Sequence, residues 1–531
     1  MYDLLIRNGR VVNGTGNPWF RADVAVKDGK IADVGFLSNA EAKRVINADG
    51  LVVSPGFVDM HNHSDTGILL NPKADNMIRQ GVTLIVFPNC GSGLYPVVED
   101  LAGRGRGRLE VDWSTYEEYL QKTEKTGTSV NVAPLIGFGT IRRYVMGFEM
   151  RDPTQGELDK MKGLVEEAMK GGAFGLTTGL RYVPQSYSKT EEVLELAKVA
   201  ARYGGFYTTH QRDEGDRGDP VGSVKEVIKI AEKAGLPANI SHFKILSKIF
   251  WNKCDEILEL IEEARSRGID ITADQYPYPA SGTGPEAWIP RWASEGGRRR
   301  LLERLNDPEL SKQIKAGLTE VMEQRGGPEH QLISSYPLKP SYVGKTITEV
   351  ATELGKDPAD AFFELYRESV EKSVTGEISG FGLMSFNMSD ENVEKMIKKP
   401  WVMISTDSSI QVPTPGRVSS EHPRNYGSYP RVLGRYVREK KVLGLEEAVR
   451  KMTSLETQRL GIFDRGLIVK GMWADITIFD PELVIDKAEY APQEENQRYP
   501  EGIPYVIVNG ILTIDGDRHT GALAGKILRK R

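Results

Sequence analysis

The spacing of apolar residues changes twice along the chain. Short apolar runs separated by turns fill the first fifty residues and resume after about residue 466, with Asn-Gly and Asp-Gly pairs such as Asn8-Gly9 and Asp28-Gly29 at hairpin spacing between them. Because chain termini often lie close together, residues 1–53 and 466–531 are predicted to form one small β-sandwich domain from both ends of the chain.

Between these ends, short apolar strands alternate with amphipathic helical stretches, which is typical of βα units around a parallel sheet. Helices such as 189–203, 223–234 and 254–266 carry apolar residues three and four positions apart. The number of expected strands is that of a closed, TIM-like (β/α)8 barrel, so residues 54–465 are predicted to form an α/β barrel domain. The strands are expected at 56–60, 84–88, 131–137, 174–178, 206–209, 238–241, 270–274 and 402–406.

The connection between the last two expected strands is far longer than the few tens of residues in an ordinary βα unit. Residues of about 283–345 are therefore interpreted as an inserted lid subdomain over the barrel mouth. Trp288 and Trp292 in this insert are candidates for contact with an apolar substrate group, and packing inside the lid is the alternative.

Composition narrows the class of protein. The 531 residues include 69 Lys and Arg against 74 Asp and Glu, a net charge of −5, which excludes a general basic surface for nucleic acid or anionic lipid. The two cysteines exclude a disulfide framework and a four-cysteine zinc module. No apolar run approaches the roughly 20 residues of a membrane helix, and the N-terminus lacks an export signal. We expect a soluble cytoplasmic protein with a small-molecule partner rather than a nucleic acid or a membrane.

Side chains with metal-ligand chemistry gather at the ends of the expected strands. Four of the seven histidines come directly after barrel strands, at the end of the barrel where active sites of this architecture lie. A cysteine follows the second strand and an aspartate follows the last. The six residues are His61, His63, Cys90, His210, His242 and Asp407, and their convergence on one mouth is the strongest functional signal in the sequence.

The positions of the four histidines suit metal binding. Side chains alternate along an extended strand, so His61 and His63 project to the same side and can reach one ion. The alternative is a pair of histidines hydrogen-bonded in a loop. His210 and His242 could each be a satisfied core histidine when taken singly, but together, at adjacent strand ends, they are interpreted as ligands, since imidazole suits zinc.

Three roles are open to Cys90: a metal thiolate, a small buried residue, or a catalytic nucleophile. The metal role is favoured because the histidines supply the rest of a tetrahedral set. Cys254, within an expected helix, is assigned to packing. Asp407 could cap a helix, but after the last strand of a metal-bearing barrel it fits better as the base that takes a proton from metal-bound water.

Together these features resemble the amidohydrolase superfamily. Many of its members bridge two metals with a carboxylated lysine after strand 4, whereas residues 172–180 (GAFGLTTGL) hold no lysine and Cys90 follows strand 2. This exchange resembles the N-acyl-D-amino-acid deacylase (D-aminoacylase) family. Further motifs that carry the resemblance are Tyr182 with Pro184, DQYPY at 274–278, FNMS at 386–389, HPR at 422–424 with Tyr426-Gly427, and Arg465-Gly466 with Ala474-Asp475.

The resemblance implies a zinc-dependent enzyme that cleaves N-acyl-D-amino acids to a carboxylate and a free D-amino acid by metal-activated water, with Asp407 as the base. It implies one tightly held zinc on Cys90, His210 and His242. A second, weaker metal position would be formed by His61, His63 and Asp407.

The resemblance also implies a set of substrate-binding residues. Arg417 would pair with the substrate α-carboxylate, which suits the two-pronged geometry of a guanidinium, and Lys244, Tyr276 and Tyr182 would assist. Surface exposure is the alternative for Arg417 and Lys244.

Two departures from the family pattern leave the substrate range open. Asn62 stands where the family usually has threonine, and Ser408 where it usually has glycine. A cyclic amidohydrolase of the dihydroorotase or hydantoinase kind is the main alternative function. A non-enzymatic scaffold protein is a further alternative, against which the full set of six candidate ligands argues. The preference for D-amino acids rests on the resemblance alone.

Overall fold

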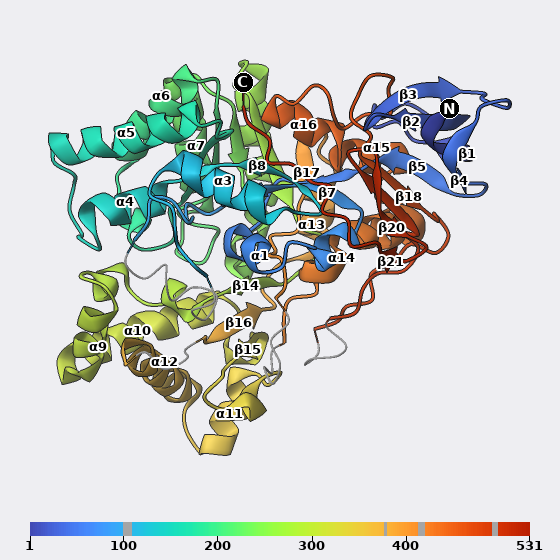
Figure 1. Cartoon of the computed structure of the whole chain (residues 1–531). Helices are drawn as coiled ribbons and strands as arrows, with labels where there is room; N and C mark the ends of the chain where they lie inside the picture. Colours follow the sequence, from blue (N-terminus) through green and yellow to red (C-terminus); the bar gives the residue numbers. More distant parts are fainter. Residues whose placement is uncertain (99–108, 376–379, 413–419, 491–496, 531) are drawn as a thin grey trace.

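Both ends of the chain contribute strands to one nine-stranded sheet in the computed structural model, which describes residues 1–98, 109–375, 380–412, 420–490 and 497–530 (Figure 1). The order is β21-β20-β19-β18-β5-β1-β2-β3, and β4 also pairs with β1. The strands are β1 (Tyr2–Val11), β2 (Phe20–Lys27), β3 (Lys30–Gly35), β4 (Ala42–Asn47), β5 (Val52–Pro55), β18 (Ile476–Phe479), β19 (Tyr505–Val508), β20 (Ile511–Asp515) and β21 (Arg518–His519).

Burial of alternate apolar side chains holds the two ends together. Ile6 and Val24 from the N-terminal part and Ile476 and Ile507 from the C-terminal part are all fully buried in one shared core. After β21 the chain leaves this sheet, and Ile527 forms a parallel bridge with Val132 in β8 (Asn131–Pro134) of the barrel. The assignment of all residues after 466 to the β domain therefore extends too far, because the last residues add main-chain pairing to the barrel instead.

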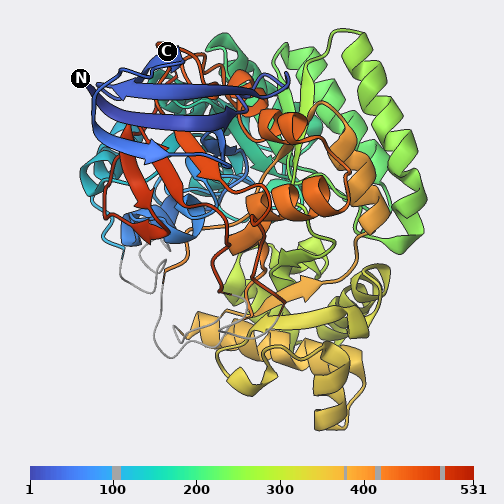
Figure 2. The same ribbon diagram turned by 90° about the vertical axis from the view of Figure 1, so that its right-hand side faces the viewer.

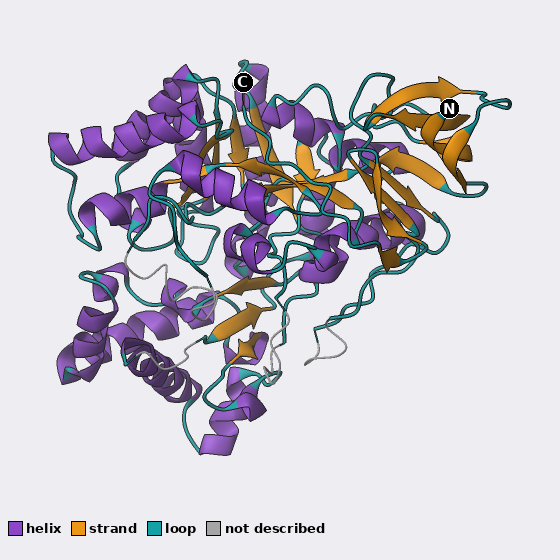
Figure 3. Cartoon of the chain, viewed as in Figure 1, coloured by secondary structure: helices purple, strands orange, loops and turns teal. Residues whose placement is uncertain are grey.

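The barrel strands form a parallel ring in two hydrogen-bonded arcs (Figure 3). One arc has the order β6-β7-β8 and the other β9-β10-β11-β12-β13-β17. The expected third strand is divided in two at Leu135, whose N–H donates to the carbonyl of Phe87 at 2.9 Å. The bounds are β6 (Phe57–Asp59), β7 (Val82–Phe87), β8 (Asn131–Pro134), β9 (Ile136–Gly137), β10 (Gly175–Gly179), β11 (Phe206–His210), β12 (Ala238–Ile240), β13 (Ile271–Gln275) and β17 (Val402–Ile404).

Main-chain hydrogen bonds beyond the ends of β6 and β17 close the ring. The N–H of Asp407 donates to the carbonyl of His61 at 3.0 Å, and the N–H of His63 donates to the carbonyl of Ser408 at 2.7 Å. Asn62 and Ser408 form a parallel bridge between the same segments. Ring closure therefore brings the first and last segments of candidate site residues together.

Helices surround the ring (Figure 3), and the longer ones, such as α6, bury an apolar stripe. In α6 the buried residues include Val193, Leu196, Ala197 and Ala200, at helical spacing. The three helices expected from periodicity appear as α6, α7 and α8. The α-helices outside the insert are α1 (Asp65–Leu70), α2 (Asp75–Ile78), α3 (Tyr116–Thr126), α4 (Phe138–Met146), α5 (Gln155–Lys170), α6 (Thr190–Arg202), α7 (Pro220–Ala234), α8 (Cys254–Ser266), α13 (Asp390–Lys398), α14 (Arg424–Arg431), α15 (Leu445–Lys451) and α16 (Ser454–Leu460), and a π-helix (Val432–Glu439) continues α14. Among the described residues, no helix has the length and apolar character needed to cross a membrane.

The insert between β13 and β17 packs beside the barrel as a unit with its own apolar core (Figures 1 and 2). It is longer than the predicted 283–345, because the three-stranded sheet β14-β16-β15 is complete only with its middle strand, which comes last in sequence. Its elements are β14 (Ser281–Thr283), α9 (Arg298–Asn306), α10 (Pro308–Gln324), β15 (Gln331–Ser335), α11 (Ile347–Leu354), α12 (Pro358–Val374) and β16 (Gly382–Ser385).

The two tryptophans of the insert differ in their surroundings. Trp288 is fully buried in the insert core, with its ring 5.2 Å from that of Phe362. Trp292 is half-buried beside the same core. Neither tryptophan is among the described residues that line the cavity at the barrel mouth. Packing in the insert accounts for both, and the expected contact with an apolar substrate group is not found.

Replacement of Trp288 by alanine is expected to lower the free energy of unfolding by about 3–5 kcal/mol, since it removes a large, fully buried side chain from the insert core. Denaturant unfolding followed by circular dichroism measures this loss. Trp292→Ala, at a half-buried position, serves as the control with a smaller expected loss. An equal effect of the two substitutions would contradict the role of Trp288 as the core residue.

Candidate metal centre and its pocket

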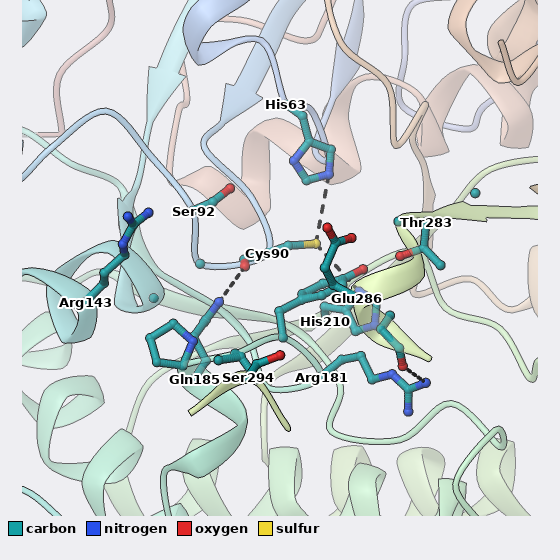
Figure 4. A pocket seen from close by; sticks show the side chains of 18 of the residues that line it. His63, Cys90, Ser92, Arg143, Arg181, Gln185, His210, Thr283, Glu286 and Ser294 are labelled. Carbon is teal, nitrogen blue, oxygen red and sulfur yellow. Dashed lines mark hydrogen bonds between the residues drawn. The ribbon is translucent and has the colours of Figure 1, made fainter. Parts of the chain in front are cut away.

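A cavity of about 960 Å³ lies where the carboxyl ends of the barrel strands face the insert (Figure 4). Five of the six candidate ligands line it, and His61 lies beneath them, fully buried. The lining candidates come from five different strand ends: His63, Cys90, His210, His242 and Asp407. The structure therefore brings the whole predicted set to one site.

The thiol of Cys90 lies at the centre of the imidazoles. Its Sγ is 3.5 Å from Nε2 of His242 and 3.7 Å from Nδ1 of His210. A tetrahedral zinc ion with ordinary bond lengths separates a sulfur ligand from a nitrogen ligand by about 3.6 Å. These three side chains therefore fit zinc in both donor type and spacing, and their ligand atoms all lie within 4.8 Å of one another.

The other three candidates adjoin this set. Oδ1 of Asp407 is 3.2 Å from Nε2 of His63 and 3.6 Å from Nε2 of His61. Sγ of Cys90 is 3.4 Å from the same atom of His61, so both groups share one continuous cluster. Arg424 places Nη1 2.7 Å from the other oxygen of Asp407. A second cation position between the two groups would share its ligands with the first.

Three candidate ligands have a left-handed backbone. The φ angles of Cys90, His242 and Asp407 are 51°, 37° and 48°. Aspartate tolerates this region, but for cysteine and histidine it costs of order 1–3 kcal/mol each. The chain therefore turns sharply where each strand ends, which aims the side chain across the mouth.

Gln185 and Gly179 hold the Cys90 turn in place. Nε2 of Gln185 donates to the carbonyl of Cys90 at 3.0 Å, and the N–H of Gly179 donates to Oε1 of Gln185 at 2.6 Å. A Cβ at Gly179 would lie 2.3 Å from the Cys90 carbonyl oxygen. The end of β10 therefore has no room for a side chain, at the strand where the sequence lacks a lysine.

A buried glutamate that the sequence reasoning missed lies behind the histidines. Oε1 of Glu214 accepts a hydrogen bond from Nζ of Lys244 at 2.7 Å and lies 3.2 Å from Nδ1 of His242. Its other oxygen is 3.4 Å from Nε2 of His210. Glu214 thus faces the nitrogen of each imidazole that points away from Cys90. Its signal in the sequence is an acidic residue four positions after His210.

Asp274 supports the cluster from inside the barrel. Its carboxylate accepts hydrogen bonds from the main-chain N–H of His242 at 2.9 Å and from Oγ of Ser405 at 2.7 Å. It also lies 3.7 Å from Nδ1 of His61. This fully buried aspartate therefore ties three strand ends together.

The cluster favours anionic forms of its acidic members. Burial alone would raise the pKa of the Cys90 thiol, but the imidazoles of His61 and His242 outweigh it and lower that pKa well below its usual range. Burial likewise opposes ionisation of Asp407, and Arg424 together with His242 holds its pKa well below the usual value. A thiolate and a carboxylate are the forms that bind a cation.

The predicted substrate residues divide by position. Lys244, Tyr276 and Tyr182 line the cavity beside the cluster, and the Tyr182 ring lies 4.8 Å from that of His210. Arg417 lies outside the described residues. The guanidinium of Arg424, which the sequence reasoning left without a role, covers the Tyr276 ring at 4.7 Å.

Three further residues lie away from the cavity lining. Asn62 is buried and donates from Nδ2 to Asp59 at 2.8 Å, and Ser408 is bridged to it where the ring closes. These two departures from the family pattern therefore alter the wall behind the ligands rather than the described lining. Cys254 is buried in α8, in keeping with its assignment to packing.

Comparisons with known proteins agree with this geometry. A family model described as the amidohydrolase family matches residues 44–514. A D-aminoacylase from Alcaligenes xylosoxydans xylosoxydans is 33% identical, over 100% of this chain and 98% of that protein. A crystal structure of D-aminoacylase has a TM-score of 0.82 and 31% identity, covering 100% of both chains. An N-acyl-D-glutamate deacylase from Bordetella bronchiseptica, complexed with zinc and a phosphonate inhibitor, has a TM-score of 0.82 and 29% identity over 99% of both chains.

Replacement of Cys90 by serine is expected to remove tight zinc binding, because the central thiolate is lost. The decrease in affinity should exceed the roughly 10–100-fold effect of changing a group outside the ligand set. Zinc content by mass spectrometry and titration with a zinc chelator measure it. Cys254→Ser is the matched control, since it replaces the other buried cysteine. Equal zinc content in both variants would contradict the role of Cys90.

Glu214→Gln is expected to weaken zinc binding by about 10–100-fold while leaving the fold intact, because the amide cannot neutralise Lys244 or accept from both imidazoles. The same chelator titration measures the change. Glu192→Gln, which alters a buried glutamate paired with Arg142 at 3.0 Å, is the control. Unchanged affinity in Glu214→Gln would show that Glu214 does not orient the ligands.

Proposed function

This chain belongs to the amidohydrolase family, in its N-acyl-D-amino-acid deacylase (D-aminoacylase) branch, and from that premise we propose that it is a zinc-dependent hydrolase of N-acyl-D-amino acids. The products are a carboxylate and a free D-amino acid. The observation that carries the proposal is the approach of Cys90 Sγ to His210 and His242, at ligand spacing, in the cavity. The D-configuration of the substrate is supported by the relatives, which are named for D-amino acids.

Cys90, His210 and His242 would hold the tight zinc ion. Zinc, when bound, supplies a Lewis acid that polarises the amide carbonyl and lowers the pKa of water. His61, His63 and Asp407 would form the weaker second position, since Oδ1 of Asp407 lies 3.2 Å from Nε2 of His63 and 3.6 Å from Nε2 of His61. Glu214 and Asp274 would keep the imidazoles of the cluster oriented through the contacts described above.

Asp407 would act as the general base of the reaction. Its carboxylate faces the cavity, is ionised, and is held by Arg424 through an ion pair of 2.7 Å. It would take the proton of the attacking water and return it to the nitrogen of the departing amine. The net result is hydrolysis of the amide without a covalent enzyme intermediate, so Cys90 has no nucleophilic role in this scheme.

The α-carboxylate of the substrate would bind beside the cluster. Lys244 and Tyr276 line that part of the cavity, and Tyr182 lies against His210. Arg417 is included in this set on the resemblance alone.

Because zinc binding depends on a reduced Cys90 thiol, we also propose a cytoplasmic location, where thiols stay reduced.

Asp407→Asn is expected to lower kcat by about 10²–10⁴-fold on N-acetyl-D-amino acids, since the amide cannot accept the proton. Zinc content should persist, because the tight set is intact. The assay compares N-acetyl-D- and N-acetyl-L-amino acids with hydantoin and dihydroorotate on a preparation of measured zinc content. A fully active Asp407→Asn would remove the base from the scheme, and hydrolysis of the cyclic substrates alone would replace the proposed reaction.

A further inference from the structure

The cavity is larger than the smallest substrate of the proposed reaction requires. Its volume of about 960 Å³ lies at the upper end of the roughly 300–1,000 Å³ of pockets that hold drug-sized ligands. An N-acetyl amino acid is a much smaller molecule, and it would occupy only the part of the cavity beside the metal cluster. The remaining volume is enough for a larger group on the substrate.

One part of the cavity lies between the barrel and the insert, and we call it the outer arm. The ends of β7 and β9, α4 and the loop after α4 form one side of it, and residues of α9 and α12 form the other. Figure 4 shows Ser92 of this arm on the opposite side of Cys90 from Thr283. The residues that define the outer arm are Ser92, Thr140 and Phe148 from the barrel and Gly297, Leu301 and Val374 from the insert.

Phe148 joins the two sides of the outer arm. Its carbonyl accepts a hydrogen bond from the N–H of Gly296 at 3.2 Å, and a Cβ on Gly297 would lie 3.2 Å from its ring. The guanidinium of Arg143, in α4, covers the same ring at 4.8 Å. An aromatic ring therefore stands in the lining where the barrel and the insert meet.

The lining of the outer arm suits an uncharged, apolar group. Phe148, Leu301 and Val374 contribute apolar side chains to it. Exposed charges of both signs stand at its edge, where Arg298 lies 3.9 Å from Glu286. We therefore expect the burial of apolar surface, rather than an ion pair, to determine what binds in the arm.

The order of the strands places the outer arm across the barrel mouth from the proposed position of the α-carboxylate. Lys244 and Tyr276, which would bind that carboxylate, follow β12 and β13. In the closed ring these strands lie opposite β7 and β9, which lead to Ser92 and Thr140. A substrate with its α-carboxylate at Lys244 and its amide at the metal cluster would therefore extend its acyl group into the outer arm.

We propose that the outer arm is the acyl-group subsite, so that the preferred substrate is an N-acyl-D-amino acid whose acyl group is an uncharged aliphatic chain longer than acetyl. This inference rests on the proposed function. It assigns to Phe148 a direct contact with the acyl chain, and it gives the insert a part in acyl-group selection through Leu301 and Val374.

A series of acyl lengths tests the subsite on the zinc-loaded protein. N-acetyl, N-butyryl and N-hexanoyl derivatives are prepared with each of several D-amino acids, so that acyl chains are compared at a constant side chain. We expect kcat/KM to rise from acetyl to hexanoyl by at least about tenfold, because a single methylene in an apolar pocket can change it by that factor.

Phe148→Ala is expected to lower kcat/KM for the N-hexanoyl substrate by about tenfold and to change that for the N-acetyl substrate by less than about threefold, because only the longer chain reaches the ring. Phe148→Leu keeps an apolar side chain, should retain most of the preference, and guards against a loss of folding in the alanine variant. Phe250→Ala is the matched control, since it removes another half-buried phenylalanine that is not among the described lining residues. It should leave the ratio of the two substrates unchanged.

The possible results separate the subsite from the proposed function. If kcat/KM were equal for the three acyl lengths, or fell with length, the subsite would be overturned and the proposed function would stand. Equal losses on the acetyl and hexanoyl substrates in Phe148→Ala would assign the ring to structure alone and would also overturn the subsite. Absence of hydrolysis of every N-acyl-D-amino acid in the series would overturn the proposed function, and the subsite with it.

Discussion

The contact between the Cys90 carbonyl and the end of β10 is the constraint on which the rest of the site depends. Gly179 leaves space for that carbonyl, and Gln185 bonds both main-chain groups. With the main chain held there, the left-handed turn at Cys90 places its sulfur 3.7 Å from Nδ1 of His210 and 3.5 Å from Nε2 of His242. A side chain on Gly179 would displace the sulfur together with the carbonyl.

Such a site stores unfavourable energy in the folded protein. Left-handed cysteine and histidine, a buried thiolate and several buried carboxylates all oppose folding. Attraction between these anions and the surrounding imidazoles offsets part of that cost. A bound cation removes the imbalance, so metal binding and folding stability are thermodynamically linked. The ring-closing hydrogen bonds between His61 and Asp407 keep the two halves of the cluster together against that cost.

The sequence predicted what depends on local periodicity. Strand ends and helices follow from hydrophobic spacing, and ligand chemistry after each strand predicted the cluster, since parallel strands bring their carboxyl ends to one edge. It could not predict contacts that depend on distant partners. Arg181 and Arg325 both contact Asp216 although they lie far apart in the chain. The role of Glu214 becomes apparent only from its hydrogen bond with Lys244, which lies 30 residues further along the chain. The predicted insert of about 283–345 was too short, because β16 (Gly382–Ser385) pairs with β14 and β15 from much further along the chain.

The two parts of the pocket come from different parts of the fold. Every candidate ligand lies at the end of a barrel strand, whereas another part of the lining combines Arg181 and Asp216 of barrel loops with Arg325 of the insert. The barrel is closed by main-chain bonds, so its ligands are fixed independently of the insert. This second part depends on how the insert packs, because Arg325 lies over the ring of Trp288 in the insert core. The part of the cavity lining that the insert contributes can therefore vary while the metal ligands stay in place.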